Sequence, residues 1–143
     1  MSNWYQDVKN FHYAFGQRVG EKPELPSAIQ ERELRKKLLQ EEFDEYIQAE
    51  NEESIVDVAD ALADIIYIAC GTAVAYGIPL DKIFNEVHRS NMAKLVNGQP
   101  IYRADGKVLK PEGWTAPDVK GILEKESEDV QRRKDLQTAI ITL

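Results

Sequence analysis

The chain has 143 residues, which is the usual size of one domain. Its residues are 43% hydrophobic and 30% charged, with a formal net charge of −7. This composition excludes a disordered chain and argues against stable nucleic-acid binding through a basic surface. Phosphate ligands remain compatible with it, because bound cations can reverse the sign of the local field.

Cys70 is the single cysteine and lies inside an apolar run. One chain therefore forms no disulfide and no cysteine zinc site, and we expect Cys70 in the core of a cytoplasmic protein. The N-terminal residues lack the basic start and apolar stretch of a signal peptide. The longest apolar segment, residues 55–78, carries three aspartates, so we expect no membrane span.

The first expected element is a short amphipathic helix over residues 4–16. Large apolar side chains recur there at helical spacing, namely Trp4, Val8, Phe11 and Phe15. Ser2 or Asn3 is the expected N-cap of this helix. Pro23 and Pro26 then interrupt the helical pattern.

Two longer helices are expected next, each opened by a capping box. Ser27 with Gln30 resembles such a box and starts a helix that runs to about Glu50. Ser54 with Asp57 repeats the pattern at the start of a third helix.

The third helix is expected to end at Gly77, and Pro79 lies in the first turn of a fourth, over about 80–95. Residues 96–117 contain three prolines and three glycines, which predict a loop long enough to suspect function. A fifth helix is expected over about 118–136. No segment shows the alternation of a strand, so the sequence predicts an all-α fold.

The second expected helix carries carboxylates where core side chains are expected. Leu34 and Leu38 define its apolar stripe. Continuing that stripe at 3.6 residues per turn reaches Glu41 or Glu42, and then Glu45. At about 100° per residue, the three glutamates fall within one arc of roughly 100°.

The third expected helix shows the same anomaly. It is apolar nearly all round, and its only charges are Asp57, Asp60 and Asp64, which lie within about 60° of one another on a helical wheel. Buried carboxylates cost several kcal/mol each unless they are compensated, and this helix contains no lysine or arginine. A divalent metal is the simplest compensation, while the alternative is an acidic face that contacts water.

Carboxylate-only ligation favours hard cations such as Mg²⁺ or Mn²⁺. The Glu-x-x-His motif of ferritin-like di-iron proteins is absent from the sequence, as are an EF-hand, a P-loop, GxGxxG and GxSxG.

The segment LLQEEFDEY followed by VADALADIIYIACGTAVAYGI resembles the MazG-like, all-α nucleoside triphosphate pyrophosphohydrolases. That superfamily includes phosphoribosyl-ATP pyrophosphohydrolase and the dimeric dUTPases. Its signature is E-E-x-x-E, a spacer, and then E-x-x-D. The first half is intact as Glu41, Glu42 and Glu45, and the aspartate of the second half matches Asp64.

One position departs from that signature. The glutamate three residues before the aspartate is replaced by Ala61. Asp60 is the adjacent carboxylate, and we expect it to take over the ligand role, helped by Asp57. The replacement by Ala61 removes one expected ligand, so it affects the geometry with which a second metal ion could bind.

The resemblance covers roughly residues 28–122. Its downstream part, EVHRSNMAKL and then DGKVLKPEGWTAPDV, is similar to a subgroup that includes dUTPase-like members. It implies one all-α domain over residues 1–143, with a four-helix-bundle core at about 28–122 and a C-terminal helix and tail at 118–143. It also implies that a second subunit completes the core, in a homodimer or homotetramer.

The function implied is hydrolysis of a (d)NTP to the (d)NMP and pyrophosphate, with Mg²⁺ as cofactor and Mn²⁺ able to substitute. The small-molecule nucleotide is the expected partner, with dUTP or dGTP as candidates. The alternative is a catalytically impaired helical module that binds nucleotide or a protein partner, because Ala61 breaks the motif. A purely structural acidic bundle is a third reading.

The expected roles follow from this resemblance. The metal ligands are Glu42, Glu45, Asp60 and Asp64, and Glu41 is the candidate general base. The candidate substrate contacts are Asn91, Lys94, Lys107 and Trp114. Trp114 could instead pack the long loop down onto the protein.

Overall fold

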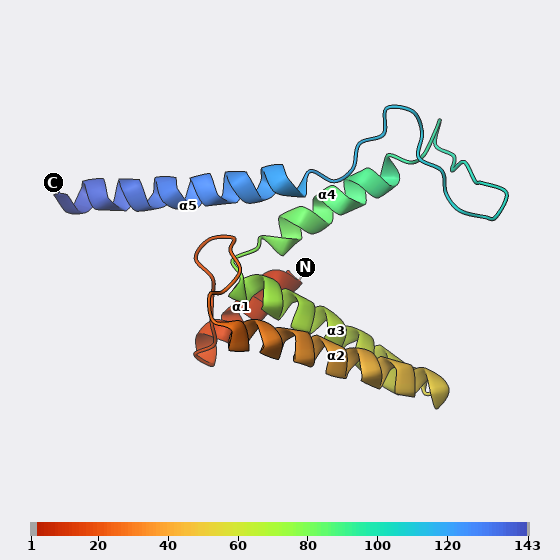
Figure 1. Cartoon of the computed structure of the whole chain (residues 1–143), viewed down its shortest axis with the longest axis horizontal. Coiled ribbons are helices and arrows are strands. Elements are labelled where there is room, and N and C mark those ends of the chain that lie inside the picture. Colours follow the sequence, from red (N-terminus) through yellow and green to blue (C-terminus); the bar gives the residue numbers. More distant parts are fainter. Residues whose placement is uncertain (1–2, 143) are drawn as a thin grey trace.

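The computed structural model describes residues 3–142 as five α-helices joined by loops (Figure 1). The helices are α1 (Trp4–Ala14), α2 (Ile29–Asn51), α3 (Ile55–Ala75), α4 (Leu80–Met92) and α5 (Val119–Thr142). Residues 3–142 contain no β-strand, only two isolated bridges in the long loop. The predicted all-α fold is confirmed.

Two of the predicted N-caps are confirmed. The Asn3 side chain accepts a hydrogen bond from the backbone N–H of Gln6 and caps α1, while Ser2 lies outside the described residues. The Ser54 hydroxyl accepts from the backbone N–H of Asp57, at 3.2 Å, and caps α3. Each cap satisfies one of the backbone donors that a helix leaves unpaired at its start.

The predicted capping box of the second helix is wrong. Ala28 is the N-cap of α2, and no side-chain hydrogen bond caps this helix among the described residues. Ser27 lies one residue before the cap position. Pro26 is fully buried just before it, so packing of the incoming chain sets where α2 begins.

Three other helix ends differ from the expected ones. α1 ends at Ala14, and α4 ends at Met92, where Lys94 and Leu95 close a turn on the carbonyls of Asn91 and Met92. α5 continues to Thr142, six residues past the predicted end. Helix ends depend on local packing and fraying more than helix interiors do.

α2 and α3 form an antiparallel hairpin joined by residues 52–54, and α1 packs against α3 (Figure 1). The small buried core of this unit contains Val8 of α1 with Cys70 and Val74 of α3. The expected burial of Cys70 is confirmed.

The segment between α1 and α2 crosses the C-terminal end of α3. The backbone N–H of Gly20 donates to the Val74 carbonyl at 2.8 Å, and that of Glu24 donates to the Tyr76 carbonyl at 3.0 Å. A side chain on Gly20 would collide with the backbone at Gly77, so this close crossing requires glycine.

α4 leads away from the unit formed by α1, α2 and α3, whereas α5 contacts α4 and passes beside the segment between α1 and α2 (Figure 1), where Lys134 pairs with Glu21 at 2.9 Å. Large apolar side chains on α2, α3 and α4 consequently remain exposed in the single chain, among them Phe43, Ile47, Leu62, Ile66 and Phe84. Exposed apolar surface on this scale is expected of a subunit whose core is completed by another copy. The predicted homo-oligomer stays a prediction.

By length and composition alone, α3 is the one helix within residues 3–142 that could cross a membrane. In the fold it lies between α1 and α2 and packs against both. Apolar helices at the centre of a helical bundle have the same character.

The caps generate a stability prediction. We expect Ser54→Ala to lower the free energy of unfolding by about 1 kcal/mol, because the N–H of Asp57 loses its acceptor. Ser27→Ala is the matched control, because Ser27 caps no helix, and it should change stability by less than about 0.5 kcal/mol. Urea denaturation of both variants measures the difference; equal losses would contradict the assigned caps.

Candidate active site

α2 and α3 meet in a regular antiparallel register, and we call the row of facing residues the seam. Glu42 of α2 faces Asp64 of α3, and Arg35 of α2 faces Gly71 of α3. On each helix the two positions are seven residues apart, which is two turns and about 10.5 Å. An acidic pair and a basic position therefore lie along the same helix interface.

Three carboxylates converge in the seam, and we call Glu42, Glu45 and Asp64 the carboxylate cluster. One oxygen from each lies within 4.8 Å of the others. Glu42 and Asp64 are half-buried, whereas Glu45 is exposed. Oxygens bound to one Mg²⁺ lie at most about 4.2 Å apart, so small side-chain rotations would make these three its ligands.

Glu42 is the most perturbed carboxylate of the cluster. Its Oε2 is buried and has no hydrogen-bond partner within the described part of the chain. Burial raises the pKa of Glu42, and the neighbouring charges of Asp64 and Glu45 raise it further. An orphaned, desolvated acceptor between two carboxylates is an environment that a hard cation would satisfy, so these residues fit a divalent metal.

Asp60 lies outside the carboxylate cluster. With Asp57, Glu45 and Glu52 it lines an adjoining hollow of about 280 Å³. Ala61 belongs to the same hollow and is only 3% exposed, so the missing glutamate would have pointed into the seam beside Glu45. A ligand role for Asp60 stays a prediction, and it would act from the neighbouring hollow.

Glu41 is exposed and also lies outside the carboxylate cluster. Its charge contributes to the raised pKa of Glu42, so it is close enough to act on the cluster electrostatically. Its role as general base stays a prediction.

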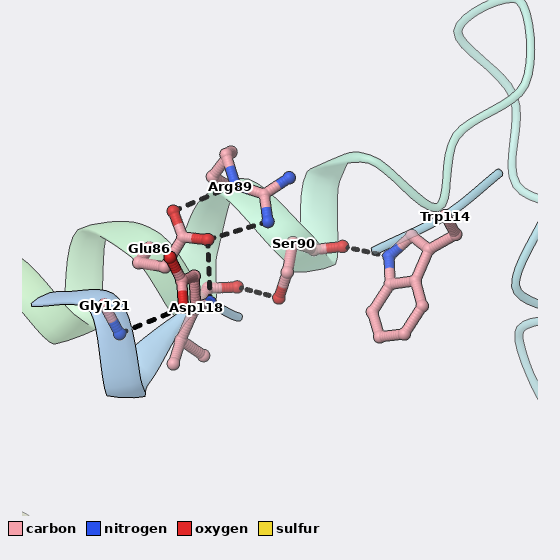
Figure 2. Close-up of polar contacts among 7 residues, drawn as sticks. Glu86, Arg89, Ser90, Trp114, Asp118 and Gly121 are labelled. Atoms are coloured by element: carbon pink, nitrogen blue, oxygen red, sulfur yellow. Dashed lines mark hydrogen bonds and ion pairs between the residues drawn. The ribbon is translucent and has the colours of Figure 1, made fainter. Parts of the chain in front are cut away.

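The long loop is fastened to α4 by a second group of contacts (Figure 2). The indole N–H of Trp114 donates to the Ser90 carbonyl at 2.6 Å. The Glu86 carboxylate accepts from the Arg89 guanidinium and from the backbone N–H of Asp118 at 3.1 Å. These bonds lower the pKa of Glu86 to about 2. Trp114 therefore packs the loop down, which was the alternative to contact with a base.

The predicted substrate contacts gather around this loop. The Lys94 ammonium donates to the Asn91 side chain at 3.0 Å and lies 5.7 Å from the centre of the Trp114 ring. Lys110, a second lysine of the long loop, lies closer to the ring, at 4.7 Å. The backbone N–H of Lys107 bonds to Asp105 in the loop tip. We call Asn91, Lys94, Lys110 and Trp114 the cationic patch.

The single chain does not bring the cationic patch to the carboxylate cluster. α4 leads away from the α2–α3 hairpin (Figure 1), and the patch begins in its last turn with Asn91 and continues into the loop that follows. The two halves of the predicted site are therefore separate within one copy.

Sequence patterns did not single out Arg35 or His12, yet both line a hollow of about 480 Å³ at the other end of the seam. Arg35 is 8% exposed, its Nε has no hydrogen-bond partner in the described structure, and burial lowers its pKa. The spacing in the sequence could have indicated Arg35, because it lies seven residues before Glu42 and therefore on the same face of the helix.

The α2–α3 hairpin thus presents E-E-x-x-E on one helix and an aspartate on the next, within a chain that is all-α over its described residues. The model of the phosphoribosyl-ATP pyrophosphohydrolase family matches residues 8–91, which is more than half of the chain. The chain belongs to this family and so to the MazG-like, all-α superfamily of pyrophosphohydrolases, which act on phosphoric anhydrides. A comparison with curated proteins finds no match.

The raised pKa of Glu42 generates a pH prediction. The folded protein binds this proton more tightly than the unfolded chain does, so metal-free stability should fall as pH rises from the ordinary value of 4.5 through the raised value. Glu42→Gln removes the ionisation, and we expect it to raise the melting temperature at pH 7 and flatten this pH dependence.

Glu33→Gln is the matched control for that prediction. It is the same substitution on the same helix, at an exposed residue that forms an ion pair with exposed Lys36, and it should leave the pH dependence intact. Melting curves in excess chelator from pH 4 to pH 8 measure both variants. A lower melting temperature of Glu42→Gln at pH 7 would contradict the environment described for Glu42.

Proposed function

We propose that the protein is a divalent-metal-dependent nucleotide pyrophosphohydrolase that converts a (d)NTP to the (d)NMP and pyrophosphate. The observation that carries this proposal is the convergence of Glu42, Glu45 and Asp64 in a member of a pyrophosphohydrolase family. Phosphoribosyl-ATP, which gives the family its name, contains the same kind of anhydride. We favour a (d)NTP because the segment after α4 resembles a dUTPase-like subgroup.

The chain's own residues account for holding the metal and the water. Glu42, Glu45 and Asp64 would hold Mg²⁺ or Mn²⁺, with Asp60 reaching it from the adjoining hollow. When bound, the cation neutralises polyphosphate charge and makes water a better nucleophile. The helices keep these side chains in place before substrate arrives, which is what an efficient site requires.

In the proposed reaction, a water oxygen bonds to the α-phosphorus and the bond from that phosphorus to the bridging oxygen breaks. The electron pair of the broken bond leaves on pyrophosphate. Glu41, one residue from Glu42, accepts the proton from the attacking water. The products are the nucleoside monophosphate and pyrophosphate.

We further propose that a second copy of the chain completes the site. The cationic patch carries the positive charge that polyphosphate needs, but it lies apart from the carboxylate cluster within one chain. The exposed apolar faces of α2, α3 and α4 provide the surface for association. Docking of two copies would bring Asn91 and Lys94 of one copy to the carboxylates of the other.

The second candidate function is a catalytically impaired module that binds nucleotide or a protein partner. The observation that favours it is Ala61, which is buried beside Glu45 where the family signature has a carboxylate. The two functions differ in turnover, because only the first predicts release of pyrophosphate.

The test of catalysis is a pyrophosphate-release assay with Mg²⁺ on phosphoribosyl-ATP and on all common NTPs and dNTPs. We expect turnover that disappears in excess EDTA. Glu45→Gln and Asp64→Asn should each lower kcat by more than about 100-fold while the fold survives, because each removes a ligand from the cluster. Glu33→Gln is the control and should keep the wild-type rate.

Asp60→Asn should lower kcat by orders of magnitude and Asp57→Asn by less, if Asp60 replaces the missing glutamate. Turnover in EDTA, or near wild-type rates for both Glu45→Gln and Asp64→Asn, would refute the metal site. A folded protein that releases no pyrophosphate from any of these nucleotides would support the impaired module instead.

The shared site generates a mixing prediction. Glu45→Gln and Lys94→Met should each be inactive alone, because one lacks a carboxylate ligand and the other a phosphate contact. Equal mixing with subunit exchange should restore about a quarter of wild-type activity in a two-fold symmetric dimer, since half of the dimers then contain one intact site. A mixture that stays inactive although exchange is shown by mass spectrometry would place both residues in one chain's site.

A further inference from the structure

The end of the long loop returns along α4 in an antiparallel register that two hydrogen bonds fix (Figure 2). The Glu86 carboxylate accepts from the backbone N–H of Asp118 at 3.1 Å, and the Ser90 carbonyl accepts from the indole N–H of Trp114 at 2.6 Å. Glu86 and Ser90 lie four residues apart, on one face of α4. Trp114 and Asp118 lie four residues apart on the returning segment, so each step along the helix is matched by one step back along the loop.

The next step of this register brings two lysines together. Lys94 follows Ser90 by four residues, and Lys110 precedes Trp114 by four residues. Their ammonium groups lie 5.7 and 4.7 Å from the centre of the Trp114 ring. Neither lysine forms an ion pair within residues 3–142. Two positive charges therefore gather at one ring without a carboxylate, and a phosphate group would neutralise them.

Glu86 is held in place from its own helix. Its two carboxylate oxygens accept from Nε and Nη2 of Arg89, at 2.9 and 2.8 Å, and one of them also accepts from the Asp118 N–H. The bonds from Arg89 and Asp118 hold the pKa of Glu86 at about 2. The carboxylate consequently stays ionised, and the contact to the loop stays intact, from mildly acidic to basic pH.

Asp118 extends this fastening into α5. Its Oδ1 accepts from the backbone N–H of Gly121 at 3.0 Å, in the first turn of α5 (Figure 2). A side chain on Gly121 would collide with the Asp118 carboxylate, so the contact requires glycine. The returning segment is thus tied to α4 through the Asp118 backbone and to α5 through the Asp118 side chain.

The fastening matters because the lysines come from the two ends of a long loop. Lys94 follows the last turn of α4, whereas Lys110 is exposed near the other end of the loop. Ordering so long a segment costs conformational entropy. If the loop were free, a ligand would have to supply that free energy when it binds, and bonds made in the free protein remove this cost from the binding step.

We propose that Glu86 is a positioning residue for phosphate binding, because it fastens the loop to α4 in the register that gathers Lys94 and Lys110 at Trp114. The polyphosphate of the nucleotide binds to these two lysines. This inference rests on the proposed function and names the residue that forms the cationic patch before substrate arrives. Glu86 acts through the loop, since both of its carboxylate oxygens are engaged by Arg89 and Asp118.

The kinetic test is Glu86→Ala in the pyrophosphate-release assay. The variant loses the acceptor for the Asp118 N–H but keeps both lysines. We expect KM to rise roughly 10-fold while kcat stays within about threefold, because substrate must then order the loop as it binds. Glu86→Gln keeps an amide oxygen that can accept from Asp118, so it should restore most of the affinity.

Gly121→Ala tests the same fastening from the side of α5. It displaces the Asp118 carboxylate and leaves Glu86 unchanged, so it should raise KM in the same direction. Circular dichroism checks the fold of each variant. Because Gly121→Ala replaces a helical glycine by a better helix former, it keeps the proposal testable even if Glu86→Ala does not fold.

Lys82→Met is the matched control. Lys82 forms an ion pair with Glu126 at 3.0 Å, which joins the same two helices one turn before Glu86 and lies outside the loop. It should leave KM at the wild-type value. Hydrogen exchange of residues 111–118, measured by mass spectrometry, should be faster in Glu86→Ala and unchanged in Lys82→Met.

Binding of inorganic tripolyphosphate separates this inference from the proposed function. The probe has no base or sugar, and calorimetric titration in excess chelator keeps metal from the carboxylate cluster. Wild type and Lys82→Met should bind it, whereas Glu86→Ala and Lys94→Met should bind it roughly 10-fold more weakly. If this pattern holds but no nucleotide is hydrolysed, the proposed function fails and the positioning role stands.

Three results would overturn the inference while leaving catalysis intact. A wild-type protein that hydrolyses nucleotide but does not bind tripolyphosphate would show that the patch is no phosphate site. Faster exchange of the loop in Glu86→Ala with an unchanged KM would make the fastening purely structural. A lower kcat at unchanged KM would assign Glu86 a role other than positioning the phosphate contacts.

Discussion

Like charges held together between two helices are the constraint on which the rest of this molecule depends. One oxygen each of Glu42, Glu45 and Asp64 lies within 4.8 Å of the others, and burial together with the charges of Asp64 and Glu45 raises the pKa of Glu42. The α2–α3 hairpin must offset this cost through its apolar packing. In return, the carboxylates need little rearrangement to receive a cation, so the free energy spent in folding is not required again at binding.

The seam also orders charge along its length. Its acidic end is separated from Arg35 by a stretch where Leu38 and Ile68 line the hollow wall. The register of α2 and α3 therefore separates two ends of the seam. The carboxylate cluster at one end repels anions unless a cation is bound, and the hollow at the other end is largely apolar but contains Arg35 and His12.

Features set by local sequence could be predicted, whereas features set by packing could not. The Ser54 cap and the glutamates of α2 follow from spacing within a single helix. Ser27 failed as a cap because buried Pro26 fixes the entry to α2. Arg35 stands in a strongly charged run, and its burial depends on tertiary neighbours such as His12 of α1 and Gly71 of α3. The separation of the cationic patch from the carboxylates likewise depends on where α4 points, which no local pattern records.

The contacts around Trp114 also make it an optical reporter. Its indole donates to a backbone carbonyl, and two ammonium groups lie within 6 Å of its ring, so its emission depends on a local electric field. An anion that draws Lys94 or Lys110 away from the ring face would change that field. The other tryptophan, Trp4, lies on α1 and is 61% exposed, so replacing it with phenylalanine would leave a fluorescence signal belonging to the loop alone.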